Sequence, residues 1–277
     1  MNNFGDSPTD LLVRARSVLL DALNALQDHS DAVIVIGAQA VYLRTGGIDV
    51  ALAEATKDSD VAVDPRLLAD DPRIEAAMKH AGFLPDANDQ PGSWVSTDGI
   101  PVDIMVPDAL AGPGRRGARI PPHDARATRR AKGLEAVLVD FSEIEISALD
   151  PGDPRVQRVK VAGPAALLVA KLHKLGERVG TPHRLNDKDA HDIYRILRAI
   201  DTEELRRGFV LLLANELSED ITREALRYFE ELFTAGPSAL GSMMAGRAEE
   251  GVGDPEQVST ATSILARDLV NVLPGVK

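Results

Sequence analysis

The sequence contains no cysteine, which excludes disulfides, thiolate nucleophiles and cysteine-ligated zinc sites. No apolar run approaches the ~20 residues that a membrane-spanning helix needs, so we expect no membrane association. The first residues, MNNFGDSPTD, lack a basic stretch followed by an apolar one, so we expect no signal peptide and a cytoplasmic location. The chain also lacks a Walker-type phosphate loop and any histidine pair with metal-ligand spacing.

The charge of the chain is unevenly distributed. Its 277 residues, enough for one large or two modest domains, carry a net charge of −12. Residues 113–132, however, hold seven basic residues and one acidic residue, a net charge of +6, which leaves −18 for the remainder. Such asymmetry indicates an anionic partner, although a solvated, mobile loop would have the same composition. The basic residues are Arg115, Arg116, Arg119, Arg126, Arg129, Arg130 and Lys132.

The hydrophobic pattern divides the chain near residue 160. Before this point we expect helices and strands in alternation, and after it helices alone. An Asp98-Gly99 turn predicts a hairpin between two of the strands, and the glycine-rich residues 236–254 predict a loose connection. The predicted strands cover residues 32–37, 57–64, 93–97, 100–106, 135–140, 143–147 and 157–161, and the predicted helices 11–26, 38–44, 74–78, 165–178, 187–200, 204–217, 223–233 and 255–273.

Three aspartates interrupt the predicted strands. Asp58 and Asp60 are two residues apart and therefore point to the same face of their strand. Asp103 lies opposite the apolar face of IPVDIMV. If these two strands are neighbours, three carboxylates converge, and such a group suits one or two Mg²⁺ or Mn²⁺ ions. A solvent-facing strand with incidental acids remains the alternative.

The segment VIGAQAVYLR, upstream of the aspartates, predicts a strand, a glycine turn and a helix start. Gly37 would let the backbone approach a ligand closely, and the backbone N–H groups that follow it suit phosphate. A simple tight strand-to-helix turn has the same pattern.

In their order and spacing, VIGAQAVYLR, TKDSDVAVD and VDIMVP resemble the AbiEii-type nucleotidyltransferases, toxins of toxin–antitoxin pairs with a polymerase-β-like fold. The resemblance continues at AKLHKLGER and NDKDAHDIYRIL and covers about residues 30–200. It implies an α+β fold, with a mixed-sheet nucleotidyltransferase domain at 1–160 and a helical domain at 161–277. The family turn usually carries Gly-Ser, whereas this chain has Gly37-Ala38.

The resemblance also implies residue roles. Asp58, Asp60 and Asp103 would bind the metal, and Asp103 would accept the proton of an acceptor hydroxyl. Lys171, with Lys174 and Arg178 on the same helix face, would neutralise the NTP phosphates, although an amphipathic helix with a snorkelling lysine is the alternative. The complete expected set is Asp58, Asp60, Asp103, Lys171 and Asp189 for catalysis, and Gly37, Ala38, Lys57, Lys171, Lys174 and Arg178 for the nucleotide.

Three functions follow as hypotheses. The first is transfer of a nucleoside monophosphate from an NTP to the 3′ end of tRNA by a growth-inhibiting toxin with a cognate antitoxin protein. The tRNA would be bound through Arg115, Arg116, Arg126, Arg129 and Arg130. The second is transfer to a small molecule, such as an antibiotic hydroxyl. The third, supported by Ala38 at the turn, is a non-catalytic nucleotide-binding protein of the same fold.

Overall fold

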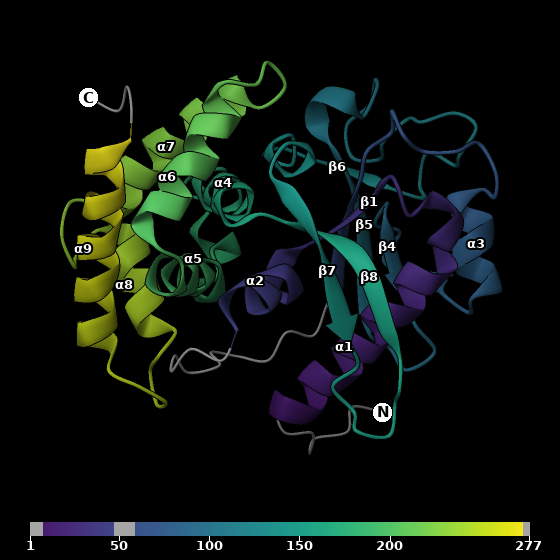
Figure 1. Cartoon of the computed structure of the whole chain (residues 1–277), viewed down its shortest axis with the longest axis horizontal. Coiled ribbons are helices and arrows are strands. Elements are labelled where there is room, and N and C mark those ends of the chain that lie inside the picture. The colour runs from purple at the N-terminus through teal and green to yellow at the C-terminus, as the bar shows by residue number, and fades with distance from the viewer. Residues whose placement is uncertain (1–7, 47–58, 274–277) are drawn as a thin grey trace. The chain divides into compact units, whose positions relative to one another are not determined.

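A computed structural model describes residues 8–46 and 59–273 of the chain (Figure 1). The described residues form two compact units. Unit 1 lies within residues 1–40, 55–131 and 142–161, and unit 2 within 41–54, 132–141 and 162–277. The chain therefore passes between the units not only near residue 160, where the hydrophobic pattern changes, but also at earlier points. Asp58 and Lys57 lie outside the described residues.

Unit 1 is built on a mixed sheet, as expected. Among the described residues, eight strands form it in the order β3-β4-β5-β2-β1-β8-β7, with β6 paired to β5 off this path. β2 is antiparallel to β1 and parallel to β5. The strands are β1 (Val33–Ile36), β2 (Ser59–Val63), β3 (Leu84–Pro85), β4 (Ser93–Val95), β5 (Pro101–Pro107), β6 (Arg129–Ala131), β7 (Phe141–Ser147) and β8 (Val156–Ala162).

The predicted alternation in β2 and β5 is confirmed. Val61 and Ile104 are register partners and are fully buried. Their face of the sheet is covered by helix α1 (Pro8–Ala25), because the hydroxyl of Ser59, on the same face as Val61, donates to the carbonyl of Ala15 at 3.0 Å. The hairpin predicted at Asp98-Gly99 connects antiparallel β4 and β5. Helix α3 (Ile74–His80) also lies in unit 1.

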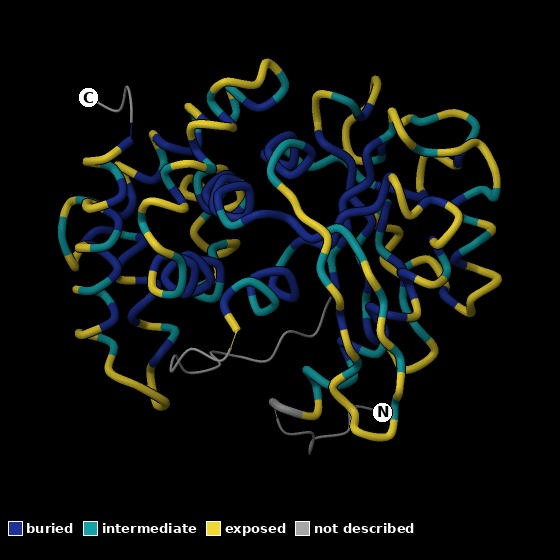
Figure 2. Tube along the Cα trace, in the orientation of Figure 1, coloured by how far each residue is buried: buried dark blue, intermediate teal, exposed yellow. Residues whose placement is uncertain are grey.

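Unit 2 contains the helices of the C-terminal half. Asn186, Asp201 and Asp254 cap α5, α6 and α9 by accepting hydrogen bonds from backbone N–H groups of the first turn. Figure 2 shows α4 buried along most of its length. The helices are α4 (Pro164–Gly176), α5 (Asp187–Ala199), α6 (Thr202–Leu213), α7 (Glu219–Phe233), α8 (Leu240–Arg247) and α9 (Pro255–Val272). A shorter helix, α2 (Gly37–Thr45), begins in unit 1 and continues into unit 2.

Two sequence predictions of local structure are wrong. Residues 135–140 form no strand; they include a buried 3-10 helix, Ala136–Leu138. A short apolar run buried on all sides has no periodicity that separates strand from helix. Residues 236–254 contain helix α8, in which Gly241 packs closely against the Phe233 ring. The small residues that suggested a loop instead permit close packing.

Candidate functional site

Asp60 and Asp103 are direct neighbours in the sheet of unit 1. They are register partners on the parallel strands β2 and β5, which places their Cα atoms about 5 Å apart. Both side chains point away from the face that carries Val61 and Ile104. Both residues are of intermediate exposure, and the side chain of Asp103 is 15% exposed. The structure thus brings together two of the three carboxylates expected from the sequence.

Gly37 lies directly against Asp60, one member of this pair. Asp60 is the register partner of Ile36, the last residue of β1, and Gly37 follows it directly. The φ angle of Gly37 is +69°, and a Cβ atom added there would lie 2.1 Å from Oδ2 of Asp60. Only glycine meets both conditions without strain. Ala38, the next residue of the turn, is buried.

The carboxylates fit a hard divalent cation. Mg²⁺ and Mn²⁺ prefer carboxylate oxygens and retain open positions for water or phosphate. Two in-register aspartates on one face of the sheet provide two such ligands. No cluster of three or more acidic or histidine side chains with metal-site geometry occurs within residues 8–46 and 59–273. Asp58, the third ligand expected, lies outside those ranges.

Arg129 balances the charge of Asp103. Its guanidinium Nη2 donates to Oδ2 of Asp103 at 2.7 Å, and the side chains are 28% and 15% exposed. Arg129 lies on β6, beside Met105 of β5. This contact was not predicted from the sequence, because a three-residue strand inside a basic segment gives almost no periodic signal. The local composition instead suggested contact with RNA.

Three arginines of the basic segment, residues 113–132, form ion pairs with carboxylates that lie outside the segment. Arg130, for example, also donates to the carbonyl of Gly112 at 2.7 Å and to that of Gly114. Arg115, Arg116 and Arg119 are exposed, and their side chains contact no acidic group in the described part of the chain. The arginines that pair with carboxylates are Arg126 with Asp89, Arg129 with Asp103, and Arg130 with Asp108.

Lys171 lies in a buried charge cluster of unit 2. Its Nζ lies 3.0 Å from Oδ1 of Asp189 and 2.6 Å from Oδ2 of Asp192, and the three side chains are 7%, 3% and 1% exposed. Lys174 and Arg178 also approach Asp189, at 2.9 and 3.6 Å. Lys171 and Asp189, both in the expected catalytic set, are therefore in direct contact. The snorkelling alternative is wrong, because the ammonium group ends on carboxylates and not in solvent.

The cluster strongly shifts the pKa values of Lys171 and Asp189. Burial alone would lower the pKa of Lys171, but the charges of Asp192 and Asp189 outweigh burial and raise this pKa well above its ordinary value. Burial alone would raise the pKa of Asp189, but the charges of Lys171 and Lys174 hold it well below its usual range. Lys171 and Asp189 are therefore both charged at neutral pH.

The expected site residues thus fall into two groups. Gly37, Ala38, Asp60 and Asp103 come together in unit 1, whereas Lys171, Lys174, Arg178 and Asp189 come together in unit 2.

Comparisons of the chain with protein-family models, curated proteins and solved structures found no match. None of the helices that the structure describes is both long enough and apolar enough to cross a bilayer.

Proposed function

We propose that the chain is a metal-dependent nucleotidyltransferase with a polymerase-β-like catalytic domain. The observation that supports this function best is the in-register pair Asp60 and Asp103, with Gly37 against Asp60. The reaction would join the α-phosphate of an NTP to an acceptor hydroxyl, break the α–β phosphoanhydride bond and release pyrophosphate. Such catalysis depends mainly on positioning and on charge stabilisation.

The residues of unit 1 would bind the metal and accept the proton of the acceptor hydroxyl. Asp60 and Asp103, with Asp58, would hold Mg²⁺ or Mn²⁺. Bound cations would stabilise the charge on the attacking and leaving oxygens. Asp103 would also accept the proton of the acceptor hydroxyl, and Arg129 would offset the charge of Asp103.

Unit 2 carries the cations to which the resemblance assigns phosphate binding. Lys174 and Arg178 keep 45% and 26% of their side chains exposed, so they are the accessible cations of the Asp189 cluster. Lys171 and Asp189 would fix the position of this cationic helix face. Lys57 would add a further positive charge.

For the acceptor, we propose the 3′ end of tRNA, and for the biological role a cytoplasmic toxin with a cognate antitoxin protein. The support is the exposed arginines of the basic segment on an otherwise acidic chain. A small-molecule acceptor, such as an antibiotic hydroxyl, would need no such segment.

One observation favours a second candidate, a non-catalytic nucleotide-binding protein of the same fold. The Arg129–Asp103 ion pair neutralises Asp103 without a metal. In that case NTP would bind without turnover.

The experiment incubates the protein with each α-labelled NTP, Mg²⁺ or Mn²⁺, and total RNA, and then locates the label. We expect label on RNA, and its loss in Asp60→Asn and Asp103→Asn. Asp108→Asn is the matched control, because Asp108 also pairs with a β6 arginine at 2.7 Å. Metal-dependent NTP binding without transfer to any acceptor would support the non-catalytic candidate. Label on an added aminoglycoside but not on RNA would support the small-molecule acceptor.

A further inference from the structure

His123 belongs to the basic segment, yet it is buried in unit 1, with 8% of the residue exposed. Its Nδ1 accepts a hydrogen bond from the backbone N–H of Ile74 at 3.2 Å, and its Nε2 lies 3.0 Å from the carbonyl of Ala69. Because Nδ1 is an acceptor, the proton of the neutral ring is on Nε2, which donates to Ala69. Only the neutral imidazole makes both bonds.

Through the bond to Ile74, His123 takes the place of a helix cap. Helix α3 begins at Ile74, and Arg73 before it makes no side-chain capping bond in the described structure. The first N–H groups of a helix have no acceptor within the helix. His123 supplies one acceptor from a position 49 residues further along the chain.

Two more hydrogen bonds fasten the same loop to the start of α3. The guanidinium of Arg73 donates to the carbonyl of Pro122. The backbone N–H of Asp124 donates to Oε2 of Glu75 at 3.1 Å. Residues 120–124, here called the latch loop, are therefore held by contacts on both sides of His123.

The surroundings of His123 disfavour a proton on its ring. Burial, the largest cause, lowers the pKa of His123, and the charges of His29 and Arg73 lower it further, against the opposing effects of Glu75 and of the backbone hydrogen bond. The His29 ring lies edge-on to His123 at 5.8 Å between centroids. Arg73 also pairs with the exposed Asp71 at 3.5 Å.

Protonation would break the cap. Once Nδ1 carries a hydrogen, it becomes a donor that faces the N–H donor of Ile74, so the hydrogen bond between them is lost. A buried imidazolium without a counter-charge and an unpaired backbone N–H are both unfavourable. Moving the ring into water removes both costs.

We propose that His123 is an acid-sensitive latch, which holds the latch loop against the start of α3 when neutral and releases it when protonated. The latch does not depend on the proposed function. It would, however, place one end of the basic segment under the control of pH.

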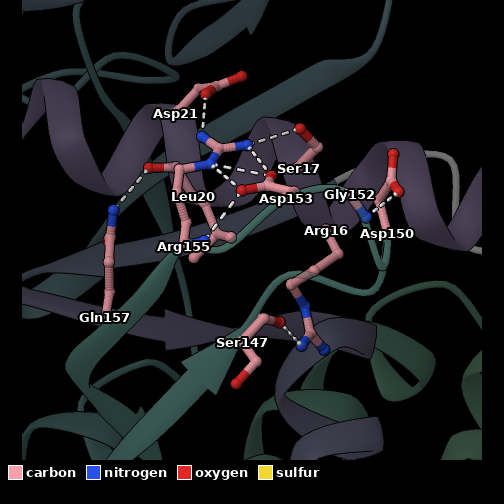
Figure 3. A network of polar contacts seen from close by, with 10 residues as sticks. All are labelled: Arg16, Ser17, Leu20, Asp21, Ser147, Asp150, Gly152, Asp153, Arg155 and Gln157. Carbon is pink, nitrogen blue, oxygen red and sulfur yellow. Dashed lines mark hydrogen bonds and ion pairs between the residues drawn. The ribbon is translucent and has the colours of Figure 1, made fainter.

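Another long-range contact of unit 1 shows a fastening that does not respond to mild acid. Figure 3 shows Arg155 of the β7–β8 hairpin bound to Asp153 and to Asp21 and Ser17 of α1. The hydrogen bonds between Arg155 and Asp153 raise the pKa of the guanidinium and lower that of the carboxylate. This pair therefore stays charged from about pH 8 to about pH 5.

The direction of the pH effect follows from linkage. The pKa of His123 is lower in the held loop than in the released loop, where it takes the ordinary value of about 6.5. The latch is therefore fully effective above about pH 6.5 and weakens as the pH falls from there toward the lowered value. One proton changes the ratio of held to released loop by at most about tenfold per pH unit.

The test measures amide hydrogen exchange of the whole chain between about pH 8 and about pH 5, as protection factors corrected for intrinsic exchange. We expect the protection of the Ile74 amide to fall by up to about tenfold per pH unit below about pH 6.5. The Ala148 amide, which donates to the carbonyl of Arg155 at 3.0 Å, is the internal reference and should keep its protection.

Trp94 fluorescence separates local release from unfolding. Its Nε1 donates to the carbonyl of Ala127 at 3.0 Å, so the single tryptophan of the chain reports the part of the basic segment that follows the latch loop. This fluorescence should stay constant while Ile74 loses protection. A simultaneous change in Trp94, Ile74 and Ala148 would mean that unit 1 unfolds, and would overturn the latch.

His123→Asn keeps an acceptor near the position of Nδ1 but cannot take up a proton in this range. We expect its Ile74 protection to be independent of pH, whereas the matched control His80→Asn, at an exposed histidine of α3, should behave as the wild type does. The latch is wrong if His123→Asn retains the wild-type pH dependence.

A measurement on the wild type covers the case in which His123→Asn does not fold. Nitrogen NMR of the histidine rings should show His123 at neutral pH with a proton on Nε2 and none on Nδ1, and should show it gaining the second proton over the same pH range in which Ile74 loses protection. A proton on Nδ1 at neutral pH, or a titration that does not coincide with the loss of protection, would overturn the latch.

Discussion

Replacing Lys171 with Met, which has a similar length but no charge, tests the buried cluster of unit 2. Asp192 is 1% exposed, and Lys171 is the one cation that contacts it in the described part of the chain. Asp189 would retain Lys174 and Arg178. Removing one partner of a buried ion pair typically costs about 3–5 kcal/mol of unfolding free energy, because the other charge is left uncompensated. We expect a loss in this range at pH 7.

A second replacement separates charge from packing. In Lys171→Met/Asp192→Leu, both members of the pair become apolar, and such replacements are often neutral or stabilising. The double variant should therefore recover most of the lost stability. Two results would show that the buried ion pair does not stabilise unit 2. One is a decrease of less than about 1 kcal/mol in the unfolding free energy of Lys171→Met. The other is a double variant that is no more stable than Lys171→Met.

Urea denaturation can follow the two units by different probes. Trp94, the single tryptophan of the chain, lies in unit 1, so its fluorescence reports that unit. The three tyrosines and helices α4 to α9 lie in unit 2, so far-UV circular dichroism mainly reports unit 2. We expect Lys171→Met to shift the dichroism transition. A shift in Trp94 fluorescence alone would contradict the assignment.

The pH dependence has a defined sign. The pKa of Asp189 is lowered on folding, so its contribution is present above the unfolded value of about 3.9 and is lost as the pH falls toward the folded value. The pKa of Lys171 is raised on folding, so its contribution is present below the unfolded value of about 10.4 and is lost as the pH rises through the folded value. In the wild type, the contribution of the cluster to the unfolding free energy should therefore not change with pH between these two unfolded pKa values. The deficit of Lys171→Met should shrink as the pH falls from 7 to about 4, because acid neutralises the stranded carboxylates.

Three further predictions concern unit 1. Asp60→Asn should abolish label transfer, and it should also abolish Mn²⁺ binding as measured by calorimetry. Its thermal midpoint should stay level or rise, because the repulsion between the carboxylates of Asp60 and Asp103 is relieved. Label transfer at the wild-type rate would refute the metal role of Asp60. Gly37→Ala should lower the unfolding free energy by at least about 1–2 kcal/mol and weaken Mn²⁺ binding, since the new Cβ would overlap Asp60; unchanged metal affinity would mean that Asp60 is not a ligand. Replacing Arg115, Arg116 and Arg119 with Ala should weaken tRNA binding and flatten its salt dependence by about 0.7–0.9 per lost phosphate contact, without changing NTP affinity; an unchanged salt slope in filter binding would show that these arginines are only solvated.

The sequence determined the local features of this protein. Period-two alternation in β2 and β5 placed Asp60 and Asp103 opposite apolar faces, and the structure confirms both placements. The Asp98-Gly99 turn and the amphipathic helices were predicted for the same reason: each pattern is set by residues close together in the chain. Where a run was short and buried on all sides, as at Ala136–Leu138, this local signal disappeared.

The tertiary structure decided which of these features meet. Alternation fixes the face of an aspartate but not the neighbouring strand, so only the parallel pairing of β2 with β5 puts Asp60 beside Asp103. The same holds for the hydrogen bond from Arg129 to Asp103 and for the one from Arg16 to Gln39. These bonds join residues that lie 26 and 23 positions apart in the chain. Lys171 shows the reason most directly. Its helix position was evident from the sequence, but whether its ammonium group meets water or carboxylates depends on how α5 packs against α4, a long-range contact that no local pattern encodes.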